Sequence, residues 1–346
     1  MKRRLRLASL SLGAMCVGAL IQSNSAVLAA ESAGQGGARY QAAKREGVVN
    51  IWGTNAEDFA WIPAAFNAIY PGIKVEIDTD LNVASKVILE DRAGRHETDV
   101  VWNSEALVAP LIERNLLVDD EWEALGVRRE DIGARGHMAI TSSMAFAVAY
   151  RTDGAAPVEG PKRWKDLLDS RFRGKMAAGP LLFARLCAAL GAFDKPDEWT
   201  KYAEEFHRTT STLWTNDLLE ETIKTGERQY VVGMPYYLAE RWKAQGLPIE
   251  VTIPEPVFIT QFGSVVMRKA PHPNAARLLA AWLSSPAGRA AREHALLAVD
   301  LRPSSSHPQA KKLRDSGKIL YIDNDAAMER RNNLIPTMDR IISGVK

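Results

Sequence analysis

The sequence predicts an α/β protein of two lobes joined by a two-strand hinge. Residues 48–114 alternate short β-branched runs with amphipathic helical segments, and the same alternation restarts at residue 175. Such a β-α-β pattern predicts parallel-rich sheets flanked by helices. Two long stretches, 138–150 and 256–267, lie between the α/β units and are typical of strands that cross from one lobe to the other. A cleft between such lobes is expected to close on a ligand by a hinge motion.

The first α/β unit is expected to start with a helix and to continue with alternating strands and helices. A helix before Pro71-Gly72 carries its apolar residues on one face, and Ser104 stands where it can cap the last helix of the unit. The expected elements are helices over 38–45, 59–69, 83–93 and 105–114, and strands over 48–52, 73–77 and 99–102.

The second unit follows the same pattern. Asn216 is placed to cap a helix, and Pro235 suits the first position of another. The expected strands cover 175–178, 213–215, 229–234, 249–253 and 263–267, and the expected helices cover 183–190, 197–209, 217–225 and 235–244, before a pair opened by Pro273 and Pro286. We therefore assign residues 30–141 and 264–308 to lobe 1, and residues 142–263 and 309–346 to lobe 2.

The first 29 residues have the layout of a secretory signal peptide. A basic front at residues 2–6 precedes an apolar run over 7–21, and small residues lead to Ala29. The apolar run is shorter than the roughly 20 residues that span a bilayer, so we expect export and cleavage near Ala29. The front holds four basic residues and no acidic one. Its removal turns the net charge of +2 into about −2, with 40 basic and 42 acidic residues left.

Composition and motifs argue for a binding protein and not for an enzyme. A nearly neutral chain lacks the electrostatic footprint of a nucleic-acid-binding protein. The sequence has no G-x-x-x-x-G-K-[ST] phosphate loop, no G-x-S-x-G nucleophile motif and no H-E-x-x-H zinc motif, and its histidines are scattered. Cys187, the one thiol left after cleavage, lies on an apolar helix face. We expect it to be a buried structural thiol.

Two adjacent phenols, Tyr236 and Tyr237, follow a buried strand at the start of a helix. Ligands of α/β sheets bind at the carboxyl ends of strands. The loops 53–58 and 103–105 follow predicted strands and are therefore expected ligand-binding loops as well. Phenolate is a hard oxygen donor that suits Fe(III), and a bound cation lowers the pKa of a coordinated group. Plain packing of the two rings at the edge of the sheet is the alternative that the residues leave open.

Four segments of the chain, taken in order, resemble one protein family. They read REGVVNIWGT followed by AFNAIYPGIKVE, TDVVWNSEALVAPLIERNLL, PKRWKDLLDSRFRGKMA, and KAPHPNAARLLAAWLSSPAGRAA. Their order and spacing are similar to those of periplasmic solute-binding proteins of ABC importers, in the branch that contains ferric-ion-binding proteins. The resemblance implies a type II periplasmic-binding fold and a periplasmic monomer without catalytic residues or a resident cofactor. Its implied partners are an ABC permease in the inner membrane and a small solute.

The resemblance also implies a set of ligand residues. Tyr236 and Tyr237 match the paired metal-binding tyrosines of the family, and Asn216 matches a position that contacts a synergistic anion. The acidic ligand of the first lobe corresponds to Ser104, or to Glu105 if one residue is inserted. Tyr236, Tyr237 and Glu105 are therefore the expected metal ligands.

The chain departs from the ferric pattern in two loops. It has Thr54-Asn55 where ferric binders often carry histidine or a further tyrosine, and its loop 179–183 lacks the serines of an anion loop. Arg185 follows that loop and could hold a carboxylate or phosphonate through two hydrogen bonds. Trp102, at a strand end, and Ser142, in a crossing stretch, complete the expected ligand-binding residues.

The identity of the solute stays open at this point. Fe(III) as a transported ligand, together with an anion such as carbonate, is the first expectation. A small organic anion such as a phosphonate or a carboxylate is the alternative, which Trp102 favours. The same fold could also serve as the receptor subunit of a signalling kinase. An enzyme on this fold would need a base or a nucleophile in the cleft, and the residues indicate neither.

Overall fold

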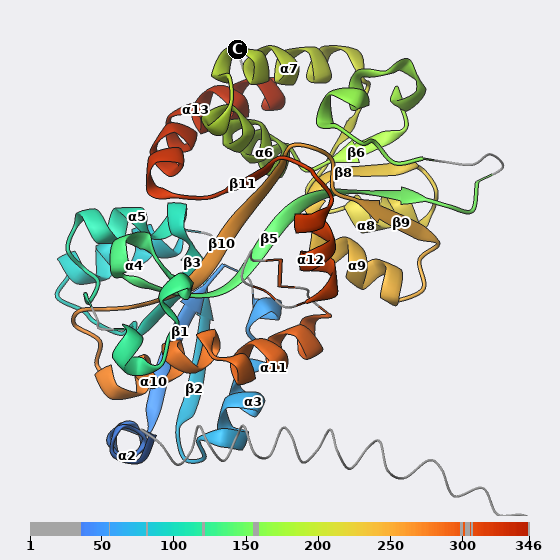
Figure 1. The fold of residues 1–346 in the computed structure, drawn as a ribbon. Coiled ribbons are helices and arrows are strands. Elements are labelled where there is room, and N and C mark those ends of the chain that lie inside the picture. The colour runs from blue at the N-terminus through green and yellow to red at the C-terminus, as the bar shows by residue number, and fades with distance from the viewer. Residues whose placement is uncertain are drawn as a thin grey trace, which may run out of the picture.

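Two long strands, β5 (Met138–Arg151) and β10 (Val257–Val266), run side by side through both halves of the molecule (Figure 1). The computed structural model describes residues 36–54, 56–80, 82–119, 122–154, 159–297, 300–301, 305 and 307–344. The expected signal peptide and Asn55 lie outside these residues. β5 and β10 are antiparallel, with Ile259 opposite Ala145. The two-strand connection that the long apolar stretches predict is therefore confirmed.

The first half of the fold is a parallel sheet, as the β-α-β pattern predicts. β1 (Val48–Gly53) lies between β2 (Lys74–Thr79) and β3 (Val100–Ser104), and β10 joins β3 in antiparallel orientation. The helices packed around it bury apolar residues such as Ile62 and Phe66. These helices are α2 (Gly36–Glu46), α3 (Ile62–Ile69), α4 (Val83–Arg92), α5 (Glu105–Glu113), α10 (Pro273–Ser284) and α11 (Pro286–Leu296).

The second half repeats this arrangement around the other ends of the long strands. β8 (Tyr230–Pro235) pairs antiparallel with β5 and parallel with β6 (Met176–Ala178), which pairs parallel with β7 (Leu213–Trp214). β9 (Ile249–Thr252) lies antiparallel to β5. The helices of this half are α6 (Pro180–Phe193), α7 (Pro196–Thr209), α8 (Leu219–Lys224) and α9 (Tyr236–Ala244). Cys187 on α6 is fully buried, which confirms a structural thiol, and burial raises its pKa.

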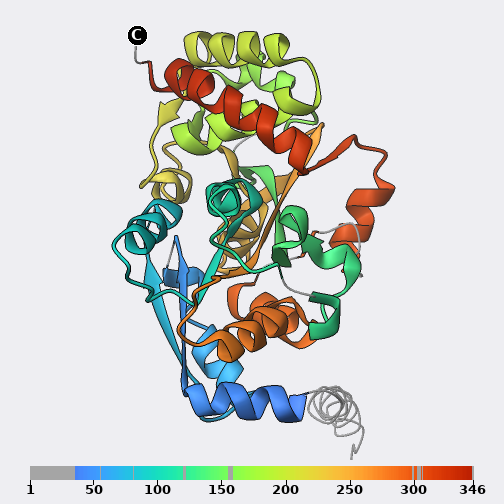
Figure 2. The same ribbon diagram turned by 90° about the vertical axis from the view of Figure 1, so that its left-hand side faces the viewer.

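The end of the chain adds three elements that the sequence patterns do not predict. They are α12 (Pro308–Asp315), β11 (Leu320–Ile322), which pairs parallel with β10, and α13 (Asp325–Ser343). The Asn324 side chain accepts a hydrogen bond from the Ala327 N–H and so caps α13. α13 lies beside α6 and α7 (Figure 1 and Figure 2), so the last helix of the chain completes the second half of the fold.

Three local expectations are wrong. The Ser104 side chain does not cap α5, and Asn103 Oδ1 instead accepts a hydrogen bond from the Ser104 N–H at 2.9 Å. Asn216 does not cap α8, because the helix begins after Leu218. Pro235 ends β8 and does not open α9.

Short elements connect these units. They are β4 (Ile132–Gly133) and the 3-10 helices η1 (Ala56–Asp58), η2 (Trp122–Leu125), η3 (Arg129–Asp131), η4 (Ala134–Gly136), η5 (Trp164–Leu168) and η6 (Ser170–Phe172). Of the helices that the structure describes, none combines the length and the apolar character needed to span a membrane.

Candidate ligand-binding cleft

A cleft of about 550 Å³ lies where the two halves of the fold meet along β5 and β10. The first half contributes β3 and the start of α5, and the second half contributes α6, α9 and α13. A volume of this size suits a small organic ligand. The lining residues are Thr54, Asp58, Asn82, Trp102, Asn103, Ser104, Ala106, Leu107, Ser142, Ser143, Met144, Phe146, Leu181, Leu182, Arg185, Tyr237, Phe258, Thr260, Phe262, Arg292, Arg331, Asn332 and Ile335.

Arg185 on α6 is one of the arginines that line the cleft. Its side chain is half-buried, and among the described residues it makes no hydrogen bond or ion pair. Burial lowers the pKa of the guanidinium, while the more distant Asp339 carboxylate acts in the opposite direction and Arg331 repels it. A guanidinium carries five N–H donors, and one that is partly removed from water can donate strong hydrogen bonds to an anion.

Arg331 on α13 is held in a different way. Its Nη1 donates to Asp323 Oδ2 at 2.5 Å, and both side chains are buried. Thr260 on β10 donates to the same carboxylate oxygen at 3.2 Å, and the guanidinium lies 5.6 Å from the centre of the Phe258 ring. These contacts fix Arg331 at the wall of the cleft.

A third arginine, Arg292 on α11, enters from the first half of the fold. Burial lowers its pKa, and the nearby Tyr237, Asp58 and Asp300 side chains act in the opposite direction. Asp300 is buried, accepts a hydrogen bond from Ser143 Oγ at 3.1 Å, and has its pKa raised to about 6 by burial. Arg292 thus resembles Arg185: acidic groups act on its pKa, but it makes no hydrogen bond or ion pair among the described residues.

The cleft also contains a polar atom that lacks a partner. Ser142 on β5 is only 1% exposed, and its Oγ has no hydrogen-bond partner in the described part of the chain. An unsatisfied buried hydroxyl costs free energy, which a bound ligand atom would recover. The structure therefore places Ser142 where the sequence analysis expects a ligand residue.

Six of the expected ligand residues line the cleft together. They come from separate elements of both halves and are Thr54, Trp102, Ser104, Ser142, Arg185 and Tyr237. The loops 53–58 and 103–105 also supply Asp58 and Asn103, so the strand ends that the β-α-β pattern marks do face this cavity.

Three other expected residues do not line the cleft. Tyr236 packs into an apolar cluster with Val257 and Ile259, and burial together with the Glu240 carboxylate raises its pKa. The Glu105 carboxylate is buried and accepts a hydrogen bond from the Ala134 N–H at 2.5 Å. Asn216 is an exposed residue of the loop before α8.

The expected ferric ligand set is therefore not assembled in this structure. Of its three members only Tyr237 lies in the cleft. The described residues also contain no group of three or more His, Cys, Asp or Glu side chains that could hold a metal ion.

The sequence patterns miss Arg292, Arg331 and Asn332. Arg331 and Asn332 lie on a helix that the patterns do not predict, in the run ERRNN of the chain end. Arg292 lies on an expected helix, but its reach into the cleft depends on the packing of α11 against α3. The adjacent arginines Arg330 and Arg331 were the sequence feature that could have pointed to this part of the cleft.

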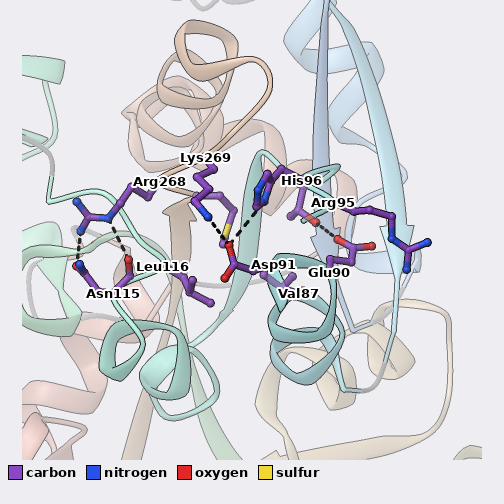
Figure 3. A pocket seen from close by; sticks show the side chains of 11 residues that line it. Val87, Glu90, Asp91, Arg95, His96, Asn115, Leu116, Arg268 and Lys269 are labelled. Atoms are coloured by element: carbon purple, nitrogen blue, oxygen red, sulfur yellow. Dashed lines mark hydrogen bonds and ion pairs between the residues drawn. The ribbon is translucent and has the colours of Figure 1, made fainter. Parts of the chain in front are cut away.

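A second cavity, of about 40 Å³, lies between α4 and the end of β10 (Figure 3). Several of its polar side chains contact one another. Lys269 Nζ lies 3.0 Å from Asp91, and His96 Nδ1 lies 3.7 Å from the same carboxylate, while Arg268 donates to Asn115 (Figure 3). This small, internally paired cavity does not compete with the cleft as a ligand site.

Comparison with known proteins decides the class. The model of the family described as bacterial extracellular solute-binding protein matches residues 61–303, well over half of the chain. The chain belongs to this family. It is a solute-binding protein and not an enzyme. No curated protein matches the chain significantly.

Solved structures share the fold of this solute-binding protein at low sequence identity. Iron-bound HitA from Pseudomonas aeruginosa has a TM-score of 0.73 and 18% identity, over 85% of this chain and 99% of that one. The substrate binding protein of an ABC transporter from Agrobacterium tumefaciens has a TM-score of 0.71 and 13% identity, over 85% and 95%. Apo ferric ion-binding protein A from Pasteurella haemolytica has a TM-score of 0.69 and 14% identity, over 85% and 98%. The solute-binding protein therefore has the two-lobed, type II periplasmic-binding fold.

Proposed function

We propose that this protein is the periplasmic solute-binding component of an ABC importer and that it captures a small organic anion in the cleft between its lobes. The observation that supports an anionic ligand is the half-buried guanidinium of Arg185, which has no ion pair among the described residues. A carboxylate or phosphonate would give it the two parallel hydrogen bonds that such a fork favours. Among the other cleft arginines, Arg331 is paired with Asp323, whereas Arg292 makes no ion pair with the described residues and adds a second positive charge at the cleft.

Delivery to an inner-membrane permease follows from the class of protein. Family membership supports an extracellular solute-binding role, and the basic, apolar and small-residue layout of residues 1–29 supports export. The mature chain, from residue 30 onward, would work as a monomer that closes on its solute and presents it to the permease.

Fe(III) is the second candidate. Several of the solved structures that share the fold are named for ferric ion or iron, and Tyr237 offers one phenol to the cleft. Binding of Fe(III) by both tyrosines requires Tyr236 to leave its apolar cluster and to lose its phenol proton. The organic-anion reading requires no rearrangement of the described residues, and this difference favours it.

Thermal unfolding of the mature protein, residues 30–346, tests the choice. We expect stabilisation by small carboxylates or phosphonates, because a ligand that binds the folded state raises its stability by mass action. Arg185→Met should abolish the shift. Arg173→Met is the matched control, because Arg173 is exposed, lies outside the cleft and has no ion pair among the described residues.

Addition of ferric citrate tests the alternative. A visible tyrosinate-to-iron absorption that disappears in Tyr237→Phe, with no stabilisation by organic acids, would establish the ferric reading and overturn ours. A colourless protein that organic acids stabilise would support the proposal.

A further inference from the structure

We infer that the solute is an aromatic acid, that is, a ring carrying a carboxylate or phosphonate. This inference rests on the proposed function, since it takes the acidic group to bind Arg185. It adds a second recognition element, the aromatic wall of the cleft, which is formed by Trp102, Phe262, Phe146 and Phe258.

The indole of Trp102 is held rigidly at this wall. Its Nε1 donates to Thr141 Oγ1 at 2.8 Å, so its polar edge is satisfied inside the protein. Its ring stacks on Phe262, with centroids 5.1 Å apart and planes 19° from parallel, and meets Phe59 edge-on at 5.2 Å. Such a fixed ring system loses little conformational freedom when a ligand binds.

A second stacked pair continues the wall on the neighbouring strands. Phe146 and Phe258 are stacked with centroids 6.2 Å apart and planes 19° from parallel. β3, β10 and β5 are adjacent in the sheet, so the two pairs come from one continuous surface. The wall is therefore built by the sheet and not by flexible loops.

Polar groups are interleaved with this wall. Phe262 on β10 is paired with Ser104 on β3 and with Ser142 on β5, so a hydroxyl residue stands beside it on either strand. Ser142 Oγ is the buried atom without a partner in the described chain. A ring that lies against the aromatic pairs could use this hydroxyl for a polar substituent.

The composition of the cleft separates an aromatic acid from the other candidates. A ferric ion or a small inorganic anion would contact Arg185 or Tyr237 and leave the aromatic wall uncovered. Trp102, Phe146 and Phe258 are each at most 8% exposed, so an aromatic ring would gain mainly by packing against these rings and Phe262, and less by removing surface from water. Offset or edge-to-face packing of aromatic rings adds about 0.5–1.5 kcal/mol beyond the area buried.

Calorimetric titration of the mature protein with matched acids tests the inference. The probes are benzoate against cyclohexanecarboxylate and phenylphosphonate against methylphosphonate. We expect the aromatic member of each pair to bind roughly three- to tenfold more tightly, as the aromatic packing energy predicts. Trp102→Leu should bring benzoate down to the level of cyclohexanecarboxylate, Trp102→Phe should keep the preference, and Trp61→Leu, on a half-buried tryptophan outside the cleft, should not change it.

The outcomes separate the two proposals. Equal affinities for the ring and its saturated analogue, with binding still lost in Arg185→Met, would overturn the aromatic inference and leave the proposed function standing. Absence of binding by all four acids would contradict both. If Trp102→Leu fails to fold, Phe262→Leu provides the same test from the other ring of the stacked pair.

Discussion

The walls of the cleft formed by α6 and by α13 both carry an arginine, yet the two arginines are in opposite situations. Arg331 on α13 is paired with Asp323 and packed over Phe258, whereas Arg185 on α6 has no partner among the described residues. Both are partly or wholly removed from water, so each would cost free energy if left uncompensated. The protein compensates the charge of Arg331 internally and leaves that of Arg185 available.

This difference distinguishes a structural cation from a recognition cation. Position in the cleft alone does not separate them, since both residues line it. The presence or absence of a carboxylate within hydrogen-bond distance does. Substitution of Asp323 removes the partner of Arg331, and substitution of Arg185 removes the other arginine of the comparison.

The largest effect is expected from removing the partner of Arg331. Asp323→Asn leaves a buried guanidinium without its counter-charge, and breaking a buried pair in this way costs about 3–5 kcal/mol. Urea unfolding of the mature protein measures the change. Lys195→Met, which breaks the exposed pair with Glu198, is the control and should leave the free energy of unfolding nearly unchanged, because exposed ion pairs contribute little. Equal losses in the two variants would show that the Arg331 pair is not structural.

The opposite side of the comparison is Arg185→Met. Loss of two charge-assisted hydrogen bonds to the bound anion should weaken binding by about 2–3 kcal/mol, roughly 30- to 150-fold. The stability of the unliganded protein should stay unchanged or rise, because the guanidinium makes no hydrogen bond or ion pair with the described residues. Calorimetric titration and urea unfolding of the same variant measure the two effects. A strongly destabilised variant would mean that Arg185 is structural, like Arg331.

Hydrophobic and polar periodicity predict most of the fold, because the strands and helices that build it have regular patterns. β5 and α7 are examples in which the expected and observed bounds agree to within a residue. α13 was missed because Pro336 lies inside a segment rich in charged and amide residues, which reads as irregular chain. That omission also removed Arg331 and Asn332 from the expected site.

The candidate site was predicted only in part, because its geometry depends on contacts between distant parts of the chain. Neighbouring residues of a helix point about 100° apart, so Tyr236 and Tyr237 need not share an environment. The packing of Tyr236 against β10 places it in an apolar cluster. The contact between Glu105 and Ala134 joins segments 29 residues apart and is equally invisible in local patterns.

A smaller effect is expected at Asp300, next to the third arginine of the cleft. Burial raises its pKa from the ordinary aspartate range to about 6, although the nearby Arg289 and Arg292 act in the opposite direction. The folded state therefore holds the proton more tightly than the unfolded state, and stability should fall by roughly 2 kcal/mol as the pH rises from about 4 to 6. Asp300→Asn should remove this part of the pH dependence in urea unfolding. If the free energy of unfolding of the variant still falls over this pH range, a group other than Asp300 is responsible for the pH dependence.

The smallest effect is expected at the tyrosine pair, where two adjacent phenols are in different environments. Tyr236→Phe removes a buried hydroxyl near the Glu240 carboxylate and should change stability by no more than about 1 kcal/mol, with no change in the affinity for organic acids. Tyr237→Phe alters the cleft surface beside Arg292 and should change affinity with little effect on stability. Unfolding and titration of both variants separate these effects. If both variants lost the same affinity, the two phenols would act together on the solute, and the packing of Tyr236 in its apolar cluster would describe only the unliganded state.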